Sequence, residues 1–321
     1  MPAYAEIEAM LAPLRRRHVP APWEPSLAYQ IDRRLKHEGG RILPEALLTA
    51  SGESLGVLVV AGAGGGKTWT VRRTLRRHPA LMGGSEAERF VVESTVPSGA
   101  TYKSMAQQLL ADSGYAAPSL RRPGWDMWAM FRERMRVLKT AVLWIDEAHD
   151  LLCKDRETVL PAVKSLMQGE GAAVVILSGT EALAEVVHSD PQVRRRFSHV
   201  RIPTLSAEAS RKAFEVVIAE YCAIVGLREA LAPDIFGRLA LASRQRFGRA
   251  AVLIVDAIEQ ALVRGDACLG IDHFADAYEL QEGCEPDRNV FLAAGWTAID
   301  PDVDPAALDM PTRHRRSRRH A

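Results

Sequence analysis

The 321-residue sequence predicts an α/β fold, in which a parallel five-stranded sheet flanked by helices precedes a small all-helical domain. The first observation is a series of short apolar runs, which are typical of strands buried on both faces. The second is that helical stretches separate most of these runs, a pattern that favours a parallel sheet. The third is that no strong strand follows Pro203. The predicted strands are residues 55–60, 90–94, 141–145, 173–177 and 199–202.

Breaks in the pattern predict the order of the domains. Near the N-terminus, apolar residues of the segment 7–14 share one helical face, and a second helix is expected from about 26 to 37. After the predicted sheet, the segment 211–225 has an apolar helical stripe, and the chain beyond Pro286 is rich in Pro and Asp. We therefore predict a helical lead-in at 1–50, an α/β core at 51–205, a helical lid at 206–284 and a loosely ordered tail at 285–321.

The charge is nearly balanced, with 41 Lys and Arg against 40 Asp and Glu. The segment 313–321 holds five arginines and no acid, so the rest of the chain has 36 basic and 40 acidic residues and a net charge near −4. Whole-chain charge thus gives no sign of nucleic-acid binding, and the basic end could contact DNA or an acidic partner. Four scattered cysteines, no membrane-spanning run and no secretory signal predict a cytoplasmic protein without a membrane partner.

A glycine-rich segment, AGAGGGKT at 61–68, directly follows the first predicted strand. It has the spacing of a phosphate-binding P-loop, with Ala in place of the first Gly. Small residues let successive N–H groups turn towards phosphate oxygens, and the helix that follows adds its positive end. We expect Lys67 to reach the β- and γ-phosphates of ATP and Thr68 to hold Mg²⁺. The predicted nucleotide-binding residues here are Gly62, Ala63, Gly64, Gly65, Gly66, Lys67, Thr68 and Trp69.

Two acidic residues, Asp146 and Glu147, follow the third predicted strand. A carboxylate at the end of a buried strand can hold the Mg²⁺ shell, so Asp146 is the second predicted metal ligand. The adjacent Glu147 can polarise the attacking water. Lys67 and Asp146 are 79 residues apart, which leaves room for one complete strand between the two motifs.

An extra strand between the motifs, together with a Glu beside the metal-binding Asp, resembles the AAA+ ATPases over residues 40–284. The resemblance implies ATP hydrolysis and a polar residue at the end of the next strand that helps to place the water; Thr180 is the residue chosen and Ser178 is the alternative. It implies an arginine finger for the neighbouring subunit in the run before the last strand, at Arg196 or at Arg195. It also implies that Arg249, in the first turn of a lid helix, touches the nucleotide and joins its binding residues.

Further segments resemble the TniB and TnsC transposition regulators within that class. They include VPSGATYK at 96–103, IDEAH at 145–149, LSGTE at 177–181 and GIDHF at 270–274. The resemblance implies a protein that binds ATP, forms rings or filaments on duplex DNA, presents this target to a transposase and disassembles on hydrolysis. A target-site adaptor is a further implied partner. The family's DNA contacts correspond here to Thr101, Lys103, Arg121 and Arg122, and contacts to phosphates would be largely independent of sequence.

Other functions remain as alternatives or are excluded. A helicase with two RecA-like domains does not fit 321 residues with a helical second half. An initiator- or loader-type AAA+ protein, or a signalling ATPase that acts as a nucleotide switch without a transposase, is the alternative. The intact Lys67, Asp146 and Glu147 argue against a scaffold that has lost hydrolysis.

Overall fold

The computed structural model describes residues 4–19, 21, 23–85, 87–116, 121–152, 155–205 and 207–303. The chain forms two compact units. One unit is Pro20–Thr204, and the other combines Met1–Val19 with Leu205–Ala321. Each unit is described by itself below.

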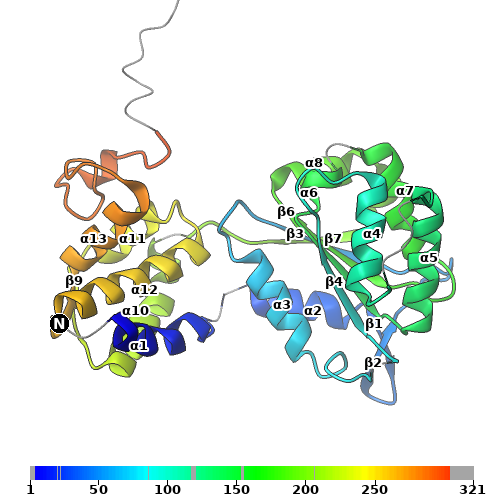
Figure 1. Ribbon diagram of the computed structural model, residues 1–321, viewed down its shortest axis with the longest axis horizontal. Helices are drawn as coiled ribbons and strands as arrows, with labels where there is room; N and C mark the ends of the chain where they lie inside the picture. The colour runs from blue at the N-terminus through cyan, green and yellow to red at the C-terminus, as the bar shows by residue number, and fades with distance from the viewer. Residues whose placement is uncertain are drawn as a thin grey trace, which may run out of the picture. The chain divides into compact units, whose positions relative to one another are not determined.

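The first unit is built on a five-stranded parallel sheet with the order β4-β5-β6-β3-β7 (Figure 1). Its fully buried central strands, such as β3, are rich in Val, Leu and Ile, as a sheet covered on both faces requires. The predicted α/β class and the parallel five-stranded sheet are confirmed. The strands are β3 (Gly56–Val60), β4 (Val91–Thr95), β5 (Val142–Asp146), β6 (Val174–Gly179) and β7 (Phe197–Arg201).

Helices cover both faces of this sheet (Figure 1). One face carries α2 (Glu24–Asp32) and α3 (Lys67–Arg77), which pack on β7 and β6 respectively. The helices of the other face share a large apolar core with the sheet, in which Phe131 and Leu109 are fully buried. These helices are α4 (Tyr102–Asp112), α5 (Gly124–Val137), α6 (His149–Leu152), α7 (Arg156–Leu166), α8 (Glu181–Ser189) and α9 (Pro191–Arg194).

The N-terminal segment differs from the helical lead-in that the sequence predicts for residues 1–50. After α2 the chain forms an antiparallel hairpin from β1 (Leu35–Glu38) and β2 (Arg41–Ala46). Gly39 and Gly40 both have positive φ, at 57° and 76°. A two-residue hairpin turn of type I′ needs this backbone at both positions, and glycine adopts it without steric cost. The Gly-Gly pair was therefore the signal for a hairpin, which helical periodicity alone does not reveal.

The helical unit also takes in the first helix of the chain, α1 (Tyr4–Arg16), which packs on α10 (Ala207–Val225) and α12 (Phe247–Arg264). Ile7, Leu11 and Leu14 are buried on the apolar face that the sequence predicts. Burial of this face explains why α1 joins helices two hundred residues away instead of the adjacent α2. The remaining elements are α11 (Ile235–Ala242), α13 (Ile271–Glu282), the short 3₁₀ helix η1 (Trp296–Ala298) and two three-residue parallel strands, β8 (Arg228–Ala230) and β9 (Cys268–Gly270).

The chain after α13 packs on the same unit up to residue 303, instead of forming the loose tail predicted from residue 285. Phe291 is buried and stacks on Phe274 with ring centroids 5.5 Å apart. Arg238 Nη1 donates to the carbonyl of Val290 at 2.7 Å. Aromatic burial therefore outweighs the Pro and Asp content here. The basic segment 313–321 lies outside the described residues. None of the helices in the described ranges is both long and apolar enough to cross a membrane.

Candidate nucleotide-binding site

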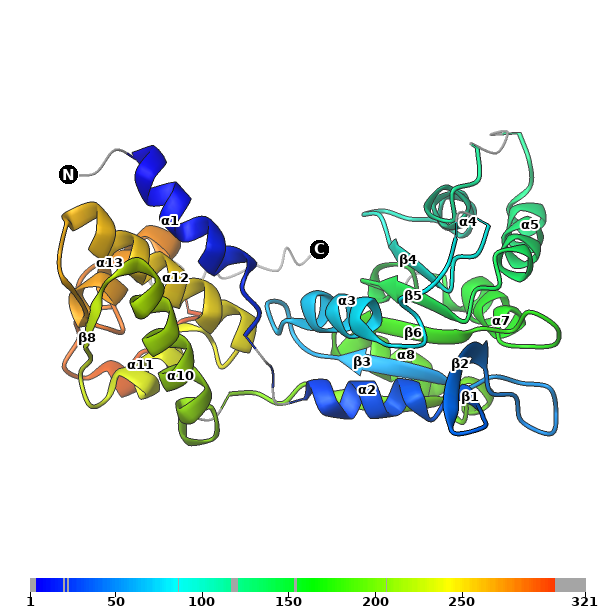
Figure 2. The same ribbon diagram turned by 90° about the horizontal axis from the view of Figure 1, so that it is seen from below.

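The P-loop connects the carboxyl end of β3 to the first turn of α3 (Figure 2). Gly64 and Gly66 have φ of 74° and 85°, a left-handed backbone that favours glycine. At Gly65 an added Cβ would lie 2.8 Å from the Cβ of Ala61, so this position has no room for a side chain. The three glycines thus allow the tight curl that turns backbone N–H groups towards a bound anion.

Lys67, predicted to bind phosphates, and Thr68, predicted to hold Mg²⁺, lie at the start of α3. Lys67 is buried, and its Nζ donates to the carbonyl oxygens of Ala61 at 3.0 Å and Gly62 at 3.3 Å. Thr68 Oγ1 donates to Oδ2 of Asp146 at 2.5 Å. Because β3 and β5 are parallel strands of one sheet, their carboxyl ends lie on the same side of it. The P-loop and Asp146 are therefore close together.

Glu147 follows Asp146 in a left-handed backbone conformation with φ of 52°. Its N–H donates to Oδ1 of Asp146 at 3.0 Å, while its side chain is 38% exposed. Left-handed backbone is uncommon outside glycine and turns the Glu147 side chain away from the direction that a continued strand would give it. The turn therefore presents a solvent-accessible carboxylate beside the buried carboxylate of Asp146.

Of the two candidates for the polar residue at the end of β6, the alternative Ser178 contacts the site directly, and the chosen Thr180 does not. It is fully buried in β6 and donates from Oγ to Oδ1 of Asp146 at 2.5 Å. Its hydroxyl also accepts a hydrogen bond from Nε1 of Trp144 at 2.8 Å. Thr180 lies one residue beyond the strand, as the N-cap of α8 without a side-chain capping bond. The structure thus brings Ser178, and not Thr180, into the hydrogen-bond network of Asp146.

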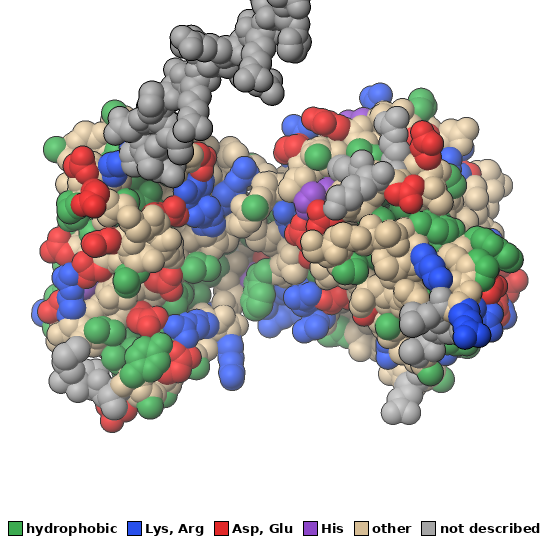
Figure 3. Space-filling model, turned by 45° about the horizontal axis from the view of Figure 1, so that its top comes forward, with side chains coloured by type: hydrophobic (Ala, Val, Ile, Leu, Met, Phe, Trp, Pro, Cys, Tyr) green, Lys and Arg blue, Asp and Glu red, His purple; other side chains and the backbone are tan. Residues whose placement is uncertain are grey.

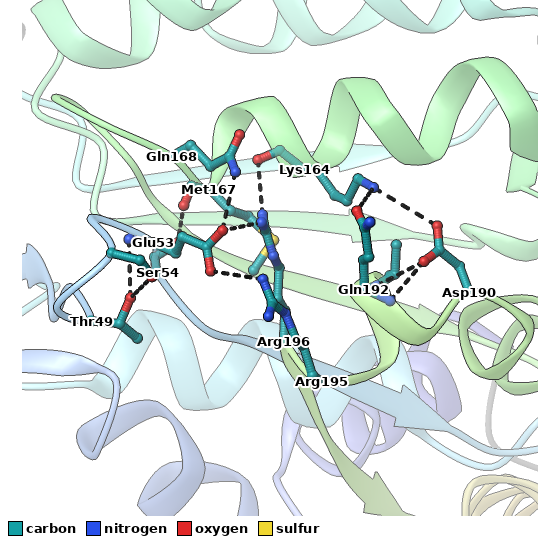
Figure 4. Close-up of polar contacts among 12 residues, drawn as sticks. Thr49, Glu53, Ser54, Lys164, Met167, Gln168, Asp190, Gln192, Arg195 and Arg196 are labelled. Carbon is teal, nitrogen blue, oxygen red and sulfur yellow. Dashed lines mark hydrogen bonds and ion pairs between the residues drawn. The ribbon is translucent and has the colours of Figure 1, made fainter.

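The arginines of the predicted finger differ in their surroundings (Figure 4). Arg196 is 4% exposed, forms an ion pair with Glu53 and lies near the carbonyl of Lys164. Arg195 has a side chain that is 66% exposed, and its Nη2 is 3.5 Å from the other Glu53 oxygen. A hydrogen bond from Gln168, with the charges of Arg196 and Arg195, holds the pKa of Glu53 below its ordinary value.

The finger candidates also lie at the opposite end of the strands from Lys67, near the amino end of β3. Phe197, which follows Arg196, pairs with Gly56 at the first residue of β3, whereas the P-loop follows the last residue of that strand. The N–H of Gly56 donates to the carbonyl of Arg196 at 2.8 Å. Neither arginine is therefore placed to contact phosphates at the P-loop of its own subunit.

Arg249 belongs to the helical unit, in the first turn of α12. Its Nη2 donates to Oε1 of Glu282 at 2.7 Å. Glu282 also receives two hydrogen bonds from Arg244, at 2.7 and 2.8 Å. These bonds and charges, led by the hydrogen bond from Arg244, hold the pKa of Glu282 below its ordinary value. Arg249 is thus held by the carboxylate of Glu282 within the helical unit.

The two segments predicted to contact DNA meet at the N-termini of α4 and α5. A Cβ on Gly124 would lie 2.8 Å from the ring of Tyr102 and 3.4 Å from the Cα of Lys103, so the helix starts touch. Thr101 uses its hydroxyl to cap α4, accepting from the Ser104 N–H at 3.2 Å. Arg121 and Arg122 are exposed, and Arg122 pairs with Asp126 at 2.9 Å. The fold therefore gathers Thr101, Lys103, Arg121 and Arg122 on one corner.

Charge on the rest of the surface is mixed. On the face shown in Figure 3, basic and acidic side chains are interspersed over both units. Attraction of a polyanion would therefore depend on local groups of cations such as the corner described above, and not on a uniform field.

Comparison with known proteins places this geometry in a family. The family model described as bacterial TniB protein matches residues 45–207, which include the whole sheet and the P-loop. The chain belongs to the TniB family. The resemblance inferred from the sequence is thereby confirmed. A search of curated proteins gives no match to this TniB family member.

Solved structures similar to this TniB protein share its fold. The Aeropyrum pernix ORC1 protein in complex with DNA is 19% identical, with a TM-score of 0.60, over 86% of this chain and 69% of that one. Cdc6p from Pyrobaculum aerophilum is 16% identical, with a TM-score of 0.59, over 89% and 76%. The Aeropyrum pernix ORC2 protein, solved with ADPNP and ADP, is 16% identical, with a TM-score of 0.53, over 83% and 71%. At these identities the likeness shows the fold, which is that of the AAA+ ATPases.

Three residues that contact predicted site residues were missed by sequence reasoning. Trp144 bonds Ser178, Glu53 holds the finger candidates, and Nδ1 of His149 lies 3.3 Å from Oε2 of Glu147. For Trp144 a signal existed, because it lies two residues before Asp146 and so faces the same side of the sheet. Glu53 gave no signal, since its partner Arg196 is 143 residues away in the chain.

Proposed function

We propose that this TniB protein is an ATPase that oligomerises on duplex DNA, selects it as a transposition target and recruits or activates a transposase. Hydrolysis of ATP would then disassemble the oligomer. The observation that carries the proposal is that Thr68, Asp146 and Glu147 are linked by hydrogen bonds beside a P-loop whose glycines have positive φ. A target-site adaptor protein is a further expected partner, through the family.

The P-loop would hold the phosphates of ATP. Backbone N–H groups of residues 62–68 and the start of α3 supply partial positive charge where the phosphates bind. Lys67 bonds loop carbonyls at 3.0 and 3.3 Å, and its ammonium can exchange these bonds for stronger ones to phosphate oxygens. Gly66 at the N-cap leaves the first turn of α3 open to the anion.

The oxygen donors of Thr68 and Asp146 fit Mg²⁺. A hydroxyl and a carboxylate are the hard ligands that this ion prefers, and here their oxygens are 2.5 Å apart. The described residues contain no cluster of three or more His, Cys, Asp or Glu that could hold a metal alone. When bound, Mg²⁺ would be held by Thr68 and Asp146 and would neutralise charge on the phosphates of ATP.

Glu147 would act as the general base for water. Its carboxylate is accessible to solvent, next to the metal-binding Asp146, and can accept a proton from a water aligned with the γ-phosphate. Ser178 and Thr180, at the end of the neighbouring strand, are the polar residues that could help to place that water. The direct bond from Ser178 to Asp146 favours Ser178 for contact with the metal shell.

The arginines support an enzyme that is complete only between subunits. Arg195 and Arg196 lie at the edge of the sheet opposite the P-loop, so we propose that they serve the site of a neighbouring subunit. The exposed Arg195 can reach outwards without breaking a buried pair, whereas Arg196 is already held by Glu53. Arg249 would contact phosphates from the lid after leaving Glu282.

The corner formed by the starts of α4 and α5 is the proposed DNA-binding surface. Two helix N-termini and the side chains of Thr101, Lys103, Arg121 and Arg122 present donors and positive charge together. Such a surface contacts phosphates without reading base edges, as target selection with little sequence preference requires.

Electron microscopy of the full chain with duplex DNA and a slowly hydrolysed ATP analogue tests the proposal. Rings or filaments that need both ligands would support it, and a monomer indifferent to DNA would contradict it. Stimulation of a transposase encoded beside this gene separates a transposition regulator from a nucleotide switch that works without one. The Glu147→Gln variant should bind ATP with unchanged affinity and lose turnover by a factor of about 10²–10⁴.

A further inference from the structure

Three side chains form a buried hydrogen-bond relay that ends on the predicted magnesium ligand. Trp144 and Ser178 are fully buried, and Asp146 is 2% exposed. Nε1 of Trp144 donates to Oγ of Ser178 at 2.8 Å, and this hydroxyl donates to Oδ1 of Asp146 at 2.5 Å. Trp144 pairs in register with Ile176, two residues before Ser178, so alternation along β5 and β6 places all three residues on the face covered by α3.

The chemistry of the donors gives the relay one direction. An indole N–H can only donate, whereas a hydroxyl has one proton and accepts at its lone pairs. Trp144 therefore occupies an acceptor site of Ser178, and the single proton of Ser178 goes to Asp146. Without the indole N–H, the hydroxyl of Ser178 would lose the partner that fixes its rotation.

The relay also decides which oxygen of Asp146 faces the P-loop. Oδ1 accepts two hydrogen bonds, from Ser178 and from the N–H of Glu147 at 3.0 Å. Oδ2 accepts from Thr68, the other proposed magnesium ligand, at 2.5 Å. Two donors thus hold Oδ1 on the protein side and leave Oδ2 directed at Thr68. Partners of this kind orient ligands and raise metal affinity.

Trp144 is itself held in place from the P-loop helix. The guanidinium of Arg72 in α3 lies 5.4 Å from the centroid of the indole ring, and its Nε donates to Glu93 of β4 at 2.5 Å. A position that needed only volume could be filled by an aromatic ring without an N–H. The clamped indole instead has its donor aimed at a buried hydroxyl.

We infer that Trp144 is a positioning residue for magnesium binding, which acts through Ser178 to orient the carboxylate of Asp146. The inference rests on the proposed nucleotide site. It predicts that loss of the indole N–H weakens Mg²⁺ binding to the nucleotide complex and leaves metal-free nucleotide binding unchanged. A residue needed only for folding would change both.

The test measures ADP affinity by calorimetry on the full chain, once in EDTA and once across a Mg²⁺ titration. Trp144→Phe and Ser178→Ala should each raise the Mg²⁺ concentration at half-saturation by about 10-fold. This is the lower end of the effect expected when a residue that orients a metal ligand is lost. Because both side chains act through one relay, the double variant should bind Mg²⁺ no more weakly than Ser178→Ala alone. ADP affinity in EDTA should stay at the wild-type value.

A matched control is available in the same unit. Trp128 is 4% exposed and donates from Nε1 to the carbonyl of Tyr102 at 3.0 Å, away from Asp146. Trp128→Phe removes the same group from the same kind of buried bond and should leave the Mg²⁺ dependence unchanged. If Trp144→Phe fails to fold, benzothienylalanine at position 144 keeps the shape of the indole and lacks its N–H.

The results separate this inference from the proposed function. Three results would each overturn the role of Trp144. They are equal losses of ADP affinity with and without Mg²⁺, additive losses of Mg²⁺ affinity in the double variant, and an equal shift of the Mg²⁺ dependence in Trp128→Phe. A wild-type chain that binds no ADP under either condition would instead overturn the nucleotide site itself.

Discussion

The carboxylate of Glu147 lies against the imidazole of His149, with Oε2 and Nδ1 3.3 Å apart. His149 begins α6, and its ring packs on Gly179 at the end of β6, where an added Cβ would lie 3.1 Å from Nδ1. The general base that we propose therefore has one oxygen beside an imidazole that is itself seated on the neighbouring strand. The other oxygen of Glu147 is left for water.

Removal of this imidazole should slow hydrolysis without weakening ATP binding. We expect His149→Ala to lower kcat by about 3- to 10-fold, less than the 10²–10⁴ that loss of a general base costs, because the carboxylate remains but is no longer held. Steady-state ATPase assays and nucleotide titrations measure the two quantities. His149→Gln, which keeps a donor, should recover part of the rate, and an unchanged kcat in His149→Ala would show that the contact is incidental.

Substitution of the glycine beneath the ring should have a similar effect. Gly179→Ala would place its Cβ 2.9 Å from Leu183 Cδ2 and 3.1 Å from Nδ1 of His149, so both side chains must shift and the contact between His149 and Glu147 changes. We expect kcat to fall as in His149→Ala, with ATP affinity retained. If the double variant loses far more than either single one, the two residues act separately.

Alanine substitutions at Arg195 and Arg196 should affect different properties of the protein. Arg195→Ala should lower DNA-stimulated ATPase by up to about 10³-fold, as expected for loss of an arginine finger, with little change in melting temperature. Arg196→Ala should lower the melting temperature, because it leaves Glu53 without its buried partner.

Mixing experiments show whether the finger acts between subunits. Glu147→Gln subunits keep their arginines and do not hydrolyse ATP, so adding them to Arg195→Ala subunits should restore part of the activity. No recovery in mixed oligomers would argue that Arg195 does not serve a neighbouring site.

The ion pair between Glu53 and Arg196 should make stability depend on pH. The hydrogen bond from Gln168, with the charges of Arg196 and Arg195, lowers the folded-state pKa of Glu53 from the ordinary 4.5, so these contacts stabilise the fold above that value. This stabilisation is lost as the pH falls through the lowered pKa. Glu53→Gln should therefore have a lower melting temperature than the wild type at neutral pH, and this difference in melting temperature should disappear in acid. Glu133→Gln, which breaks a more exposed pair with Arg136, should cause a smaller change.

The corner of α4 and α5 should give DNA binding that depends strongly on salt. Lys103→Ala and Arg121→Ala should each reduce the slope of log affinity against log salt by about 1, for all duplex sequences alike. Fluorescence anisotropy with unrelated duplexes measures this. Lys139→Ala is the matched control, since Lys139 precedes β5 at the other edge of the sheet and pairs with Glu88. An equal loss in Lys139→Ala would point to a diffuse electrostatic effect.

Local patterns in the chain were enough for the parts of the protein whose geometry depends on neighbours in sequence. Small residues before Lys67 shape a phosphate loop because their backbone can curl, and an apolar run before Asp146 places a carboxylate at the end of a buried strand. These patterns predicted the α/β class, the sheet and the nucleotide site. They did not reveal the β1–β2 hairpin, where the positive φ of Gly39 and Gly40 overrode a weak helical pattern.

Only the tertiary structure decided which distant residues meet. The order of the strands places β5 beside β6, so Ser178 and not Thr180 reaches Asp146. Packing of apolar faces assigns α1 to the helical unit, and the pairing of β7 with β3 places Arg196 near Glu53. The physical reason is that hydrogen bonds and ion pairs depend on distance in space, and the folding of the chain sets that distance through burial of side chains far apart in sequence.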